Sequence, residues 1–220
     1  GLFGPSGSGK STILRIIAGL LQPSSGEIFL ENNLISNLAP NMRSIGMVFQ
    51  NHALFPHLDV SDNIAFGLKM QKWDKRAINQ RVDTLLDLFG IKSLKHRNIN
   101  ELSVGESQRV AIARSLAPNP KLLLMDEPFS SLDETLKIKL RTEIANILNE
   151  MKISSIVVSH DIQDIVAFSN NIALIAKGEI IQLGFLGNMY DAPKNNQVSK
   201  MLGFVSIKKI INRSNNISIG

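Results

Sequence analysis

The feature that most constrains the fold is a run of nine residues near the start of the chain, Gly4-Pro5-Ser6-Gly7-Ser8-Gly9-Lys10-Ser11-Thr12. Glycines at this spacing let backbone N–H groups curl around an anion, and a following helix adds the positive end of its dipole. Lys10 can reach the outer phosphates of a nucleotide, and the Ser11 hydroxyl can ligate Mg²⁺. Apolar residues on either side predict a strand at Leu2-Phe3 and a helix that reaches Leu20-Leu21. The full pattern favours a nucleoside triphosphate over the alternative, a Gly/Ser-rich turn before an ordinary helix.

Length and composition suit one large α/β core, because 44% of the 220 residues are hydrophobic. The chain has no cysteine, which excludes disulfides and thiolate metal sites and favours a reducing compartment. No apolar run approaches the roughly 18–20 residues that span a bilayer, so any membrane role must come through a partner chain.

The net charge of +5 is compatible with a nucleotide, a nucleic acid or an anionic membrane surface. Aromatic residues make up only 5% of the chain and do not interleave with basic ones, so we expect a solvated basic surface and no nucleic-acid partner. The chain opens at Gly1, so close to the phosphate loop that the preceding strand would be unusually short. We therefore expect further sequence upstream.

Strand and helix patterns alternate along the chain, which predicts an α/β fold with a mainly parallel sheet covered by helices. Strands are predicted at 27–30, 45–49, 122–125, 156–158, 172–175 and 180–183. Helices are predicted at 60–70, 76–89, 136–151 and 162–168, with a further helix after Gly105. The stretch 51–117 therefore forms a helical subdomain, inserted into an α/β core made of 1–50 and 118–203.

Four predicted strands deliver polar groups at their carboxyl ends, where ligands bind in parallel sheets. These are the phosphate loop, Gln50, Asp126-Glu127 and His160. Asp126 is placed to hold Mg²⁺, and Glu127 to orient or deprotonate the water that attacks the γ-phosphate. Alternatively, Asp126 and Glu127 could cap a helix with their charges in solvent, and His160, as a lone histidine, could have a structural role. The remaining histidines have no ligand cluster and receive no role: His52, His57 and His96.

A second anion site is predicted within residues 102–109, where Ser103 and Gly105 precede a helix. One nucleotide site with two phosphate-binding elements, on separate subdomains, suggests a site shared between two copies of the chain. By itself the stretch also fits a plain capped helix, with Ser103 as the cap and Glu106 three residues on.

Taken in order, these elements resemble the ATP-binding cassette family, which has a P-loop NTPase fold. The resemblance covers residues 1–203 and rests on six motifs. They are Walker A GPSGSGKST at 4–12, the Q-loop Gln50, the signature LSVGE at 102–106 with SQRVAIARSLA after it, Walker B LLLMDEP at 122–128, the D-loop Ser130-Ser131-Leu132-Asp133, and the switch His160.

The resemblance implies an ATPase in which two cassettes, identical or closely related, close head-to-tail around two ATP molecules. Within one copy, the loop Gly4–Thr12 would bind ATP, and Ser11, Gln50 and Asp126 would serve Mg²⁺. Glu127 would be the general base, with Gln50 and His160 as further catalytic residues at the γ-phosphate. Ser103, Gly105 and Glu106 would cap the nucleotide of the opposite copy, and Asp133 would link the two sites.

Two departures from the family pattern stand out. Val104-Gly105-Glu106 replaces the usual Gly-Gly-Gln, and Val104 adds a branched side chain where the backbone approaches phosphate, which predicts slower closure or turnover. The aromatic residue that stacks on adenine would lie upstream of Gly1, so the base specificity has no support in this chain.

The short segment 51–101 between the Q-loop and the signature favours the separate ATPase subunit of a bacterial importer. Residues 53–58 and 63–68 are similar to importers for ferric iron, polyamines and sulfate. Within that group, His57 and the stretch 126–133 favour the ferric iron importers slightly. The resemblance implies transmembrane permease subunits, a solute-binding protein acting indirectly, and a peripheral place on the cytoplasmic face of the plasma membrane. The rival interpretation is a soluble ATPase of this family with a regulatory role.

Residues 204–220 carry Lys208, Lys209 and Arg213 among alternating apolar residues. They resemble the first strands of the small C-terminal regulatory β domain of these importers. The alternative is a frayed basic tail.

Overall fold

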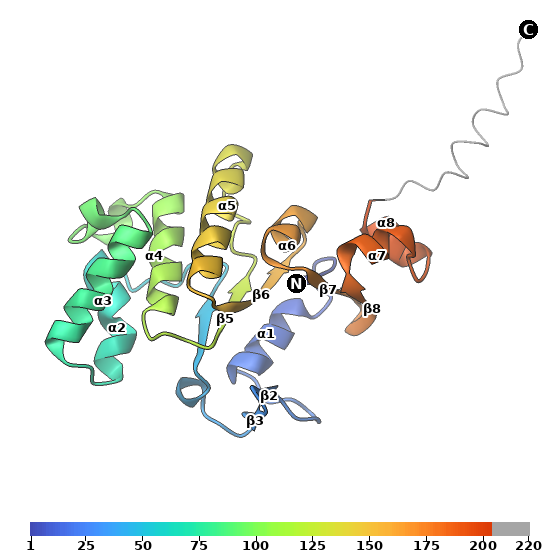
Figure 1. The fold of residues 1–220 in the computed structure, drawn as a ribbon, viewed down its shortest axis with the longest axis horizontal. Coiled ribbons are helices and arrows are strands. Elements are labelled where there is room, and N and C mark those ends of the chain that lie inside the picture. Colours follow the sequence, from blue (N-terminus) through green and yellow to red (C-terminus); the bar gives the residue numbers. More distant parts are fainter. Residues whose placement is uncertain (204–220) are drawn as a thin grey trace, which may run out of the picture.

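The computed structural model describes residues 1–203, which are built around a six-stranded sheet (Figure 1). Its strands, in spatial order, are β4 (Ile45–Val48), β5 (Leu122–Asp126), β6 (Ser154–Ser159), β1 (Leu2–Phe3), β7 (Asn171–Ala176) and β8 (Glu179–Phe185). Neighbours are parallel except β7 and β8, which are antiparallel because the turn between them is too short for a crossover. The predicted mainly parallel sheet is confirmed.

Helices cover both faces of the sheet. In Figure 1, α1 (Lys10–Ala18) lies on one side, and α5 (Glu134–Glu150) and α6 (Ile162–Phe168) lie on the other. The alternation of side chains along β5 serves both layers: Leu122 and Leu124 pack with α1, whereas Leu123 and Met125 join the larger cluster that contains α5. Burial on both faces explains why this strand is a continuous apolar run.

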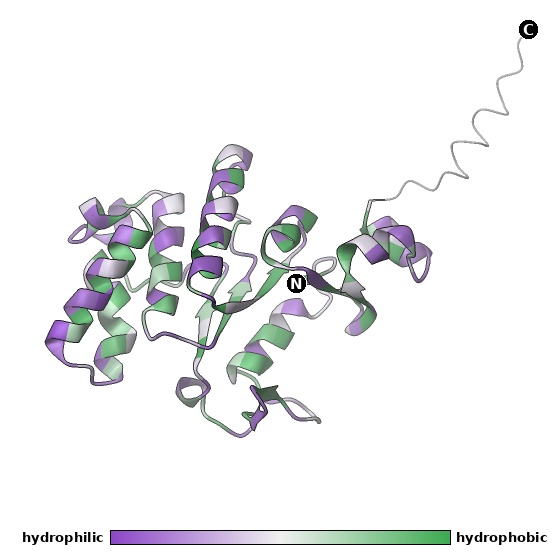
Figure 2. Ribbon diagram, viewed as in Figure 1, coloured by the Kyte–Doolittle hydropathy of each residue, from purple (hydrophilic) through white to green (hydrophobic). Residues whose placement is uncertain are grey.

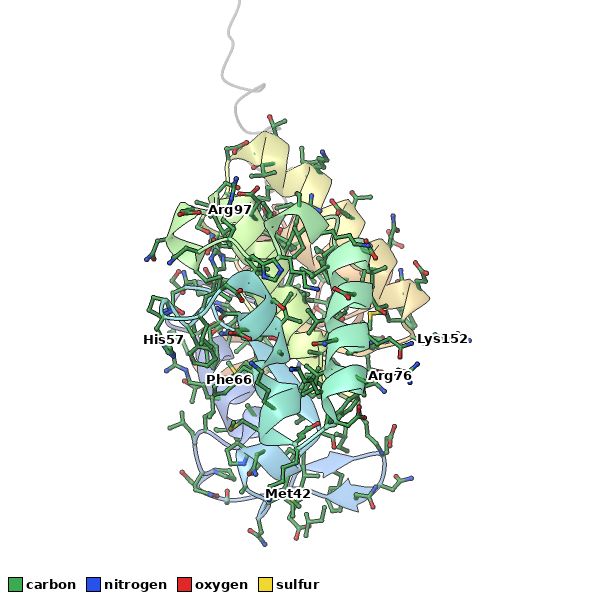
Figure 3. All side chains as sticks on the ribbon, turned by 90° about the vertical axis from the view of Figure 1, so that its left-hand side faces the viewer. Met42, His57, Phe66, Arg76, Arg97 and Lys152 are labelled. Carbon is green, nitrogen blue, oxygen red and sulfur yellow. The ribbon has the colours of Figure 1, made fainter. Side chains whose placement is uncertain are left out.

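Beside β4 stand the three helices of the 51–117 segment, α2 (Val60–Met70), α3 (Lys75–Leu88) and α4 (Val104–Leu116) (Figures 1 and 3). Asp59, Asp74 and Ser103 cap them by accepting backbone N–H bonds in their first turns. The predicted bounds of α2 are confirmed, and α3 begins one residue early because Asp74 is its cap. Short 3₁₀ turns complete the connections: η1 (Pro40–Met42), η2 (Lys92–Leu94) and η3 (Ile99–Glu101).

The apolar face predicted for the second of these helices is buried. It consists of Ile78, Val82, Leu85, Leu86 and Phe89. Figure 2 shows hydrophobic residues on the inward faces of the block and hydrophilic ones outside. One cluster of buried side chains runs from this block into the sheet, so the division at 51–117 stays a prediction about the chain's organisation.

The helix predicted to reach Leu20-Leu21 ends earlier. Gly19 takes a left-handed conformation with φ 81°, which ends α1 at Ala18, and Leu20 and Leu21 are exposed. The predicted strand at 27–30 is also shorter. Residues Phe29–Leu30 (β2) pair with Asn33–Leu34 (β3) as a separate antiparallel hairpin.

A buried arginine joins this hairpin region to the first helix. Arg43 is 1% exposed, and its guanidinium donates to four backbone carbonyls. Two belong to the last turn of α1, Ile16 and Ile17, both at 2.9 Å. The other two belong to the loop before η1, Ser36 at 2.7 Å and Leu38 at 3.0 Å. Carbonyl dipoles and the negative end of α1 thus compensate the buried charge.

After β8 the described chain closes with α7 (Leu186–Asp191) and α8 (Asn196–Met201). Within residues 1–203, every helix is too short or too polar to cross a bilayer. The predicted regulatory β domain at 204–220 lies outside the described residues.

Candidate nucleotide-binding site

The phosphate loop connects the end of β1 to the start of α1, as predicted. A Cβ on Gly4 would lie 2.2 Å from the carbonyl oxygen of Ile175 in β7, so only glycine fits there. On the other side of the loop, the backbone N–H of Gly178 donates to the Ser8 carbonyl at 3.2 Å. The β7–β8 turn therefore supports the loop from outside, and the loop's shape depends on residues far along the chain.

The ammonium group of Lys10 is anchored inside this loop. Its Nζ donates to the carbonyls of Gly4 and Pro5, both at 2.9 Å, and the residue is 4% exposed. Burial lowers the pKa of Lys10, while the negative charges of Glu127 and Asp126 act to raise it. The cation is thus fixed at the loop, where it can neutralise a phosphate.

Ser11 and Asp126 meet at the foot of the loop. The Ser11 hydroxyl donates to Asp126 Oδ1 at 2.8 Å, and Asp126 ends β5 with 5% of its surface exposed. Gln50, just after β4, lies in the same cleft as Ser11 and Asp126, with its Nε2 3.5 Å from the Ser130 hydroxyl. Hydroxyl, carboxylate and amide oxygens are ligands that Mg²⁺ prefers, so this donor set fits the predicted ion.

Glu127 and His160 form a second pair at the ends of β5 and β6. His160 Nδ1 lies 3.2 Å from Glu127 Oε2. The Glu127 side chain is 16% exposed and the His160 side chain 54%. Glu127 has a left-handed backbone with φ 45°, which is costly for a residue with a Cβ, and its N–H is held by the Val158 carbonyl at 2.9 Å. The neighbouring strand thus stabilises a strained turn that aims the carboxylate at the loop.

Two adjoining clefts contain these groups. One, of about 620 Å³, is lined by Ser11, Arg15, Phe49, Gln50, Asn51, Asp126, Ser130 and Ser131. The other, of about 370 Å³, is lined by Ser6, Gly7, Gly9, Lys10, Ser11, Thr12, Gln50 and Glu127. They share Ser11 and Gln50, so the structure brings the phosphate loop, Gln50, Asp126 and Glu127 together around one concave region.

The signature stretch is placed differently from the prediction. Helix α4 begins at Val104, so Gly105 lies within its first turn, and the expected start after Gly105 is wrong. The capping box is present: Ser103 N–H donates to Glu106 Oε2 at 2.8 Å, and Glu106 N–H to the Ser103 hydroxyl at 3.3 Å. The Ser103 hydroxyl also donates to Glu106 Oε2 at 2.7 Å, and this bond, followed in effect by the one from the Ser103 N–H, lowers the pKa of Glu106. Val104 remains 47% exposed at this helix end.

Asp133 caps α5 by accepting a bond from the Leu136 N–H at 3.0 Å. Neither of the two clefts is lined by Asp133 or by residues 102–109. Within one described chain, these predicted nucleotide contacts therefore stand apart from the phosphate loop.

Comparison with known proteins decides the family. The sequence profile of the ABC transporter family matches residues 1–130, more than half of the chain. The chain belongs to the ABC transporter family. A solved structure of an ATP-binding cassette, described as the dimeric structure of a post-hydrolysis state bound to ADP and Pi, resembles it with a TM-score of 0.74 and 32% identity over 84% of each chain. The P-loop NTPase fold is thereby confirmed.

Curated ABC relatives agree with the predicted importer group. The chain is 44% identical over 202 residues to the spermidine/putrescine import ATP-binding proteins PotA of Borrelia garinii subsp. bavariensis and Borreliella afzelii. It is 44% identical over 203 residues to the probable sulfate/thiosulfate import ATP-binding protein CysA of Chlorella vulgaris. Each comparison covers 92% of this chain, but 58% of each PotA and 86% of the CysA. The chain thus spans little more than half the length of the PotA relatives.

Sequence reasoning missed the charged residues behind His160. Lys137 and Arg141 reach from α5 to Asp161 and Asp164 at the start of α6. The available signal was the i, i+4 spacing of Lys137 and Arg141, which puts them on one face of α5. Charges on a helix usually face solvent, so this signal alone does not predict a buried cluster.

Proposed function

We propose that this protein binds ATP with Mg²⁺ and hydrolyses it, as the nucleotide-binding subunit of an importer. The supporting observation is that the phosphate loop, Asp126 and Glu127 line adjoining clefts at the carboxyl ends of the strands, with His160 against the Glu127 carboxylate. This arrangement holds a triphosphate at one end and a carboxylate for the attacking water at the other.

The roles follow from the contacts. Lys10 and the loop N–H groups bind the phosphates, and Ser11, Asp126 and Gln50 would hold the ion. Mg²⁺, when bound, offsets the negative charge on the phosphates. Glu127 orients a water molecule and accepts its proton, and His160 holds the Glu127 carboxylate in place and reads the γ-phosphate.

The site is completed by a second cassette in this proposal. Ser103, Gly105, Glu106 and Asp133 lie outside the clefts of their own chain, which is consistent with their serving the nucleotide of a partner copy. The solved relative is described as dimeric, which supports the same arrangement. The exposed Val104 side chain at this contact is expected to slow closure.

Glu127→Gln tests the chemistry. The variant should bind ATP, hold a closed dimer and hydrolyse ATP about 100-fold more slowly or worse. Glutamine has nearly the same size and shape as glutamate, but its amide cannot accept a proton from the attacking water. ATP binding by fluorescence, mass by light scattering and phosphate release give the three readouts. Glu101→Gln, on an exposed turn, is the matched control. A variant that stays monomeric with ATP, or hydrolyses it at the wild-type rate, would contradict this mechanism.

A groove of about 350 Å³ between η1, α2 and the α4–β5 connection offers a surface for a permease. Its lining includes Phe66 and Met70, which are 36% and 65% exposed. Figure 3 looks onto this face and shows Phe66 on α2, with Met42 below it. Apolar side chains left exposed here suit a helix of a membrane partner, which would keep the subunit at the cytoplasmic face of the membrane.

The relatives named for polyamine and sulfate import make these solutes the first to test, with ferric iron, suggested by the His57 segment, as the third. The full-length protein should be tagged, its membranes gently solubilised, and ATP turnover of the recovered complex measured with each solute and its binding protein. Recovery without any membrane protein would favour the soluble regulatory ATPase instead.

A further inference from the structure

A cluster of four charged side chains, two of them buried, lies behind His160. Arg141 donates to Asp164 Oδ1 through Nε at 3.0 Å and Nη2 at 2.7 Å, and its Nη2 lies 3.3 Å from Asp161 Oδ2. Lys137 Nζ donates to the same Asp161 oxygen at 2.6 Å. The Arg141 and Asp164 side chains are only 9% and 2% exposed, and those of Lys137 and Asp161 are 12% and 23% exposed, so two cations and two anions neutralise one another largely shielded from water.

This cluster fixes the backbone on both sides of His160. The Ser159 hydroxyl donates to Asp164 Oδ2 at 2.7 Å and accepts the Asp161 N–H at 2.9 Å. Asp161 also accepts the N–H of Gln163 at 2.8 Å, which caps α6. The residues before and after His160 are therefore tied to the same four charges, while the imidazole projects away to meet the catalytic carboxylate.

Stability alone does not account for these charges. Burying ions costs desolvation energy, and apolar side chains of equal size often stabilise a fold as well or better. Charged pairs differ from apolar contacts in being directional, because a guanidinium and a carboxylate fit in few relative orientations. The cluster is thus suited to setting the position of the 159–161 turn.

The cations also connect this turn to the start of α5. Asp133 caps the helix, and its carbonyl accepts the N–H of Lys137 at 2.9 Å, one turn before Arg141. Further along, Glu143 accepts Arg109 Nη2 of α4 at 2.8 Å. A single helix therefore contacts the D-loop, the turn that carries His160 and the signature helix.

We propose that Lys137 and Arg141 are positioning residues, which hold His160 at Glu127 through Asp161 and Asp164 and tie its position to the first turn of α5. This inference rests on the proposed ATPase function. Neither cation lines the clefts that hold the phosphate loop, so they act on the chemical step and not on nucleotide affinity.

The test compares Lys137→Met with Lys139→Met, the same substitution two residues along the same helix at an exposed position. In the full-length protein, Lys137→Met should lower kcat about 10- to 100-fold, because small misplacements of a catalytic group have effects of this order. KM for ATP should stay within about twofold, since the phosphate loop is untouched. Lys139→Met should match the wild type. Arg141→Lys keeps the positive charge but loses the planar guanidinium, so its kcat should be higher than that of Arg141→Met.

Two further readouts separate positioning from a general loss of structure. In a His160→Ala background, Lys137→Met should change kcat less than about twofold, because the group being positioned is gone. The NMR signal of the His160 imidazole should shift in Lys137→Met and not in Lys139→Met. An unshifted imidazole, or the same fall in kcat in both backgrounds, would overturn the positioning role while leaving the ATPase proposal intact. A wild-type protein without ATPase activity would overturn both.

Discussion

Replacing Arg43 by methionine should strongly destabilise the fold. The substitution keeps an unbranched side chain in the buried site but removes all the donors of the guanidinium. Ile16 O also accepts a backbone N–H, so within residues 1–203 three carbonyls depend on Arg43: Ile17, Ser36 and Leu38.

A fully buried acceptor left without a partner costs about 1–3 kcal/mol, which applies to Ser36 O; because Ile17 O and Leu38 O are only partly buried, about 3–9 kcal/mol for the three is an upper range. Removing the cation also removes its own desolvation cost, several kcal/mol, and this offsets part of the loss. We therefore expect Arg43→Met to lower the free energy of unfolding by about 3 kcal/mol. For an m-value of about 3 kcal/mol/M, the urea midpoint falls by about 1 M.

Urea unfolding followed by circular dichroism measures this change. Arg76→Met, on the exposed surface of α3, is the matched control and should change the midpoint by less than about 0.2 M. Arg43→Lys should lower the free energy of unfolding less than Arg43→Met does, because an ammonium group provides three N–H donors. A loss of less than about 1 kcal/mol for Arg43→Met would refute the reasoning, since it would mean that water or the backbone replaces the guanidinium at little cost.

Two further predictions concern the loop and the charge cluster. Gly4→Ala should lower the free energy of unfolding by about 1–3 kcal/mol and weaken ATP binding, because the added Cβ would meet the Ile175 carbonyl. Gly187→Ala, where a Cβ would meet open space, is the control. Equal melting temperatures for the two variants would contradict the close approach at Gly4. Burial raises the pKa of Asp161. Hydrogen bonds from Lys137 and the Gln163 N–H, together with the charges of Lys137 and Arg141, outweigh burial and lower this pKa overall from its ordinary value of 3.8. This carboxylate therefore stabilises the fold above pH 3.8 and loses that contribution as the pH falls below it. The stability difference between wild type and Lys137→Met, from urea unfolding, should shrink from pH 6 to pH 3; a constant difference would exclude this linkage.

Much of the fold and of the nucleotide site could be predicted because local patterns encode them. The apolar run 122–125 and the spacing within 60–70 identify elements whose burial is continuous or periodic. The rule that parallel strands present ligands at their carboxyl ends then brought Asp126, Glu127 and His160 to one place.

The features that escaped prediction are non-local. Arg43 and Arg141 are buried because their partners come from other segments of the chain. A prediction from neighbouring residues alone places both side chains in solvent, where charged residues usually lie. The helix end at Gly19 was missed for the opposite reason: leucines at 20 and 21 continued the helical spacing although the glycine had already ended the helix.

The interior position of β1 has a consequence for the order of folding. This strand comes first in the described chain, yet both its neighbours, β6 and β7, are made last among the parallel strands. During synthesis, Leu2 and Phe3 emerge long before Val158 and Ala173, so the residues that lead into the phosphate loop are made well before the two strands that they pair with. The loop can assume its shape only when nearly the whole cassette has left the ribosome. A nascent chain that stops before β7 cannot recruit nucleotide to stabilise itself, and ATP binding by a growing chain would report that the core is complete.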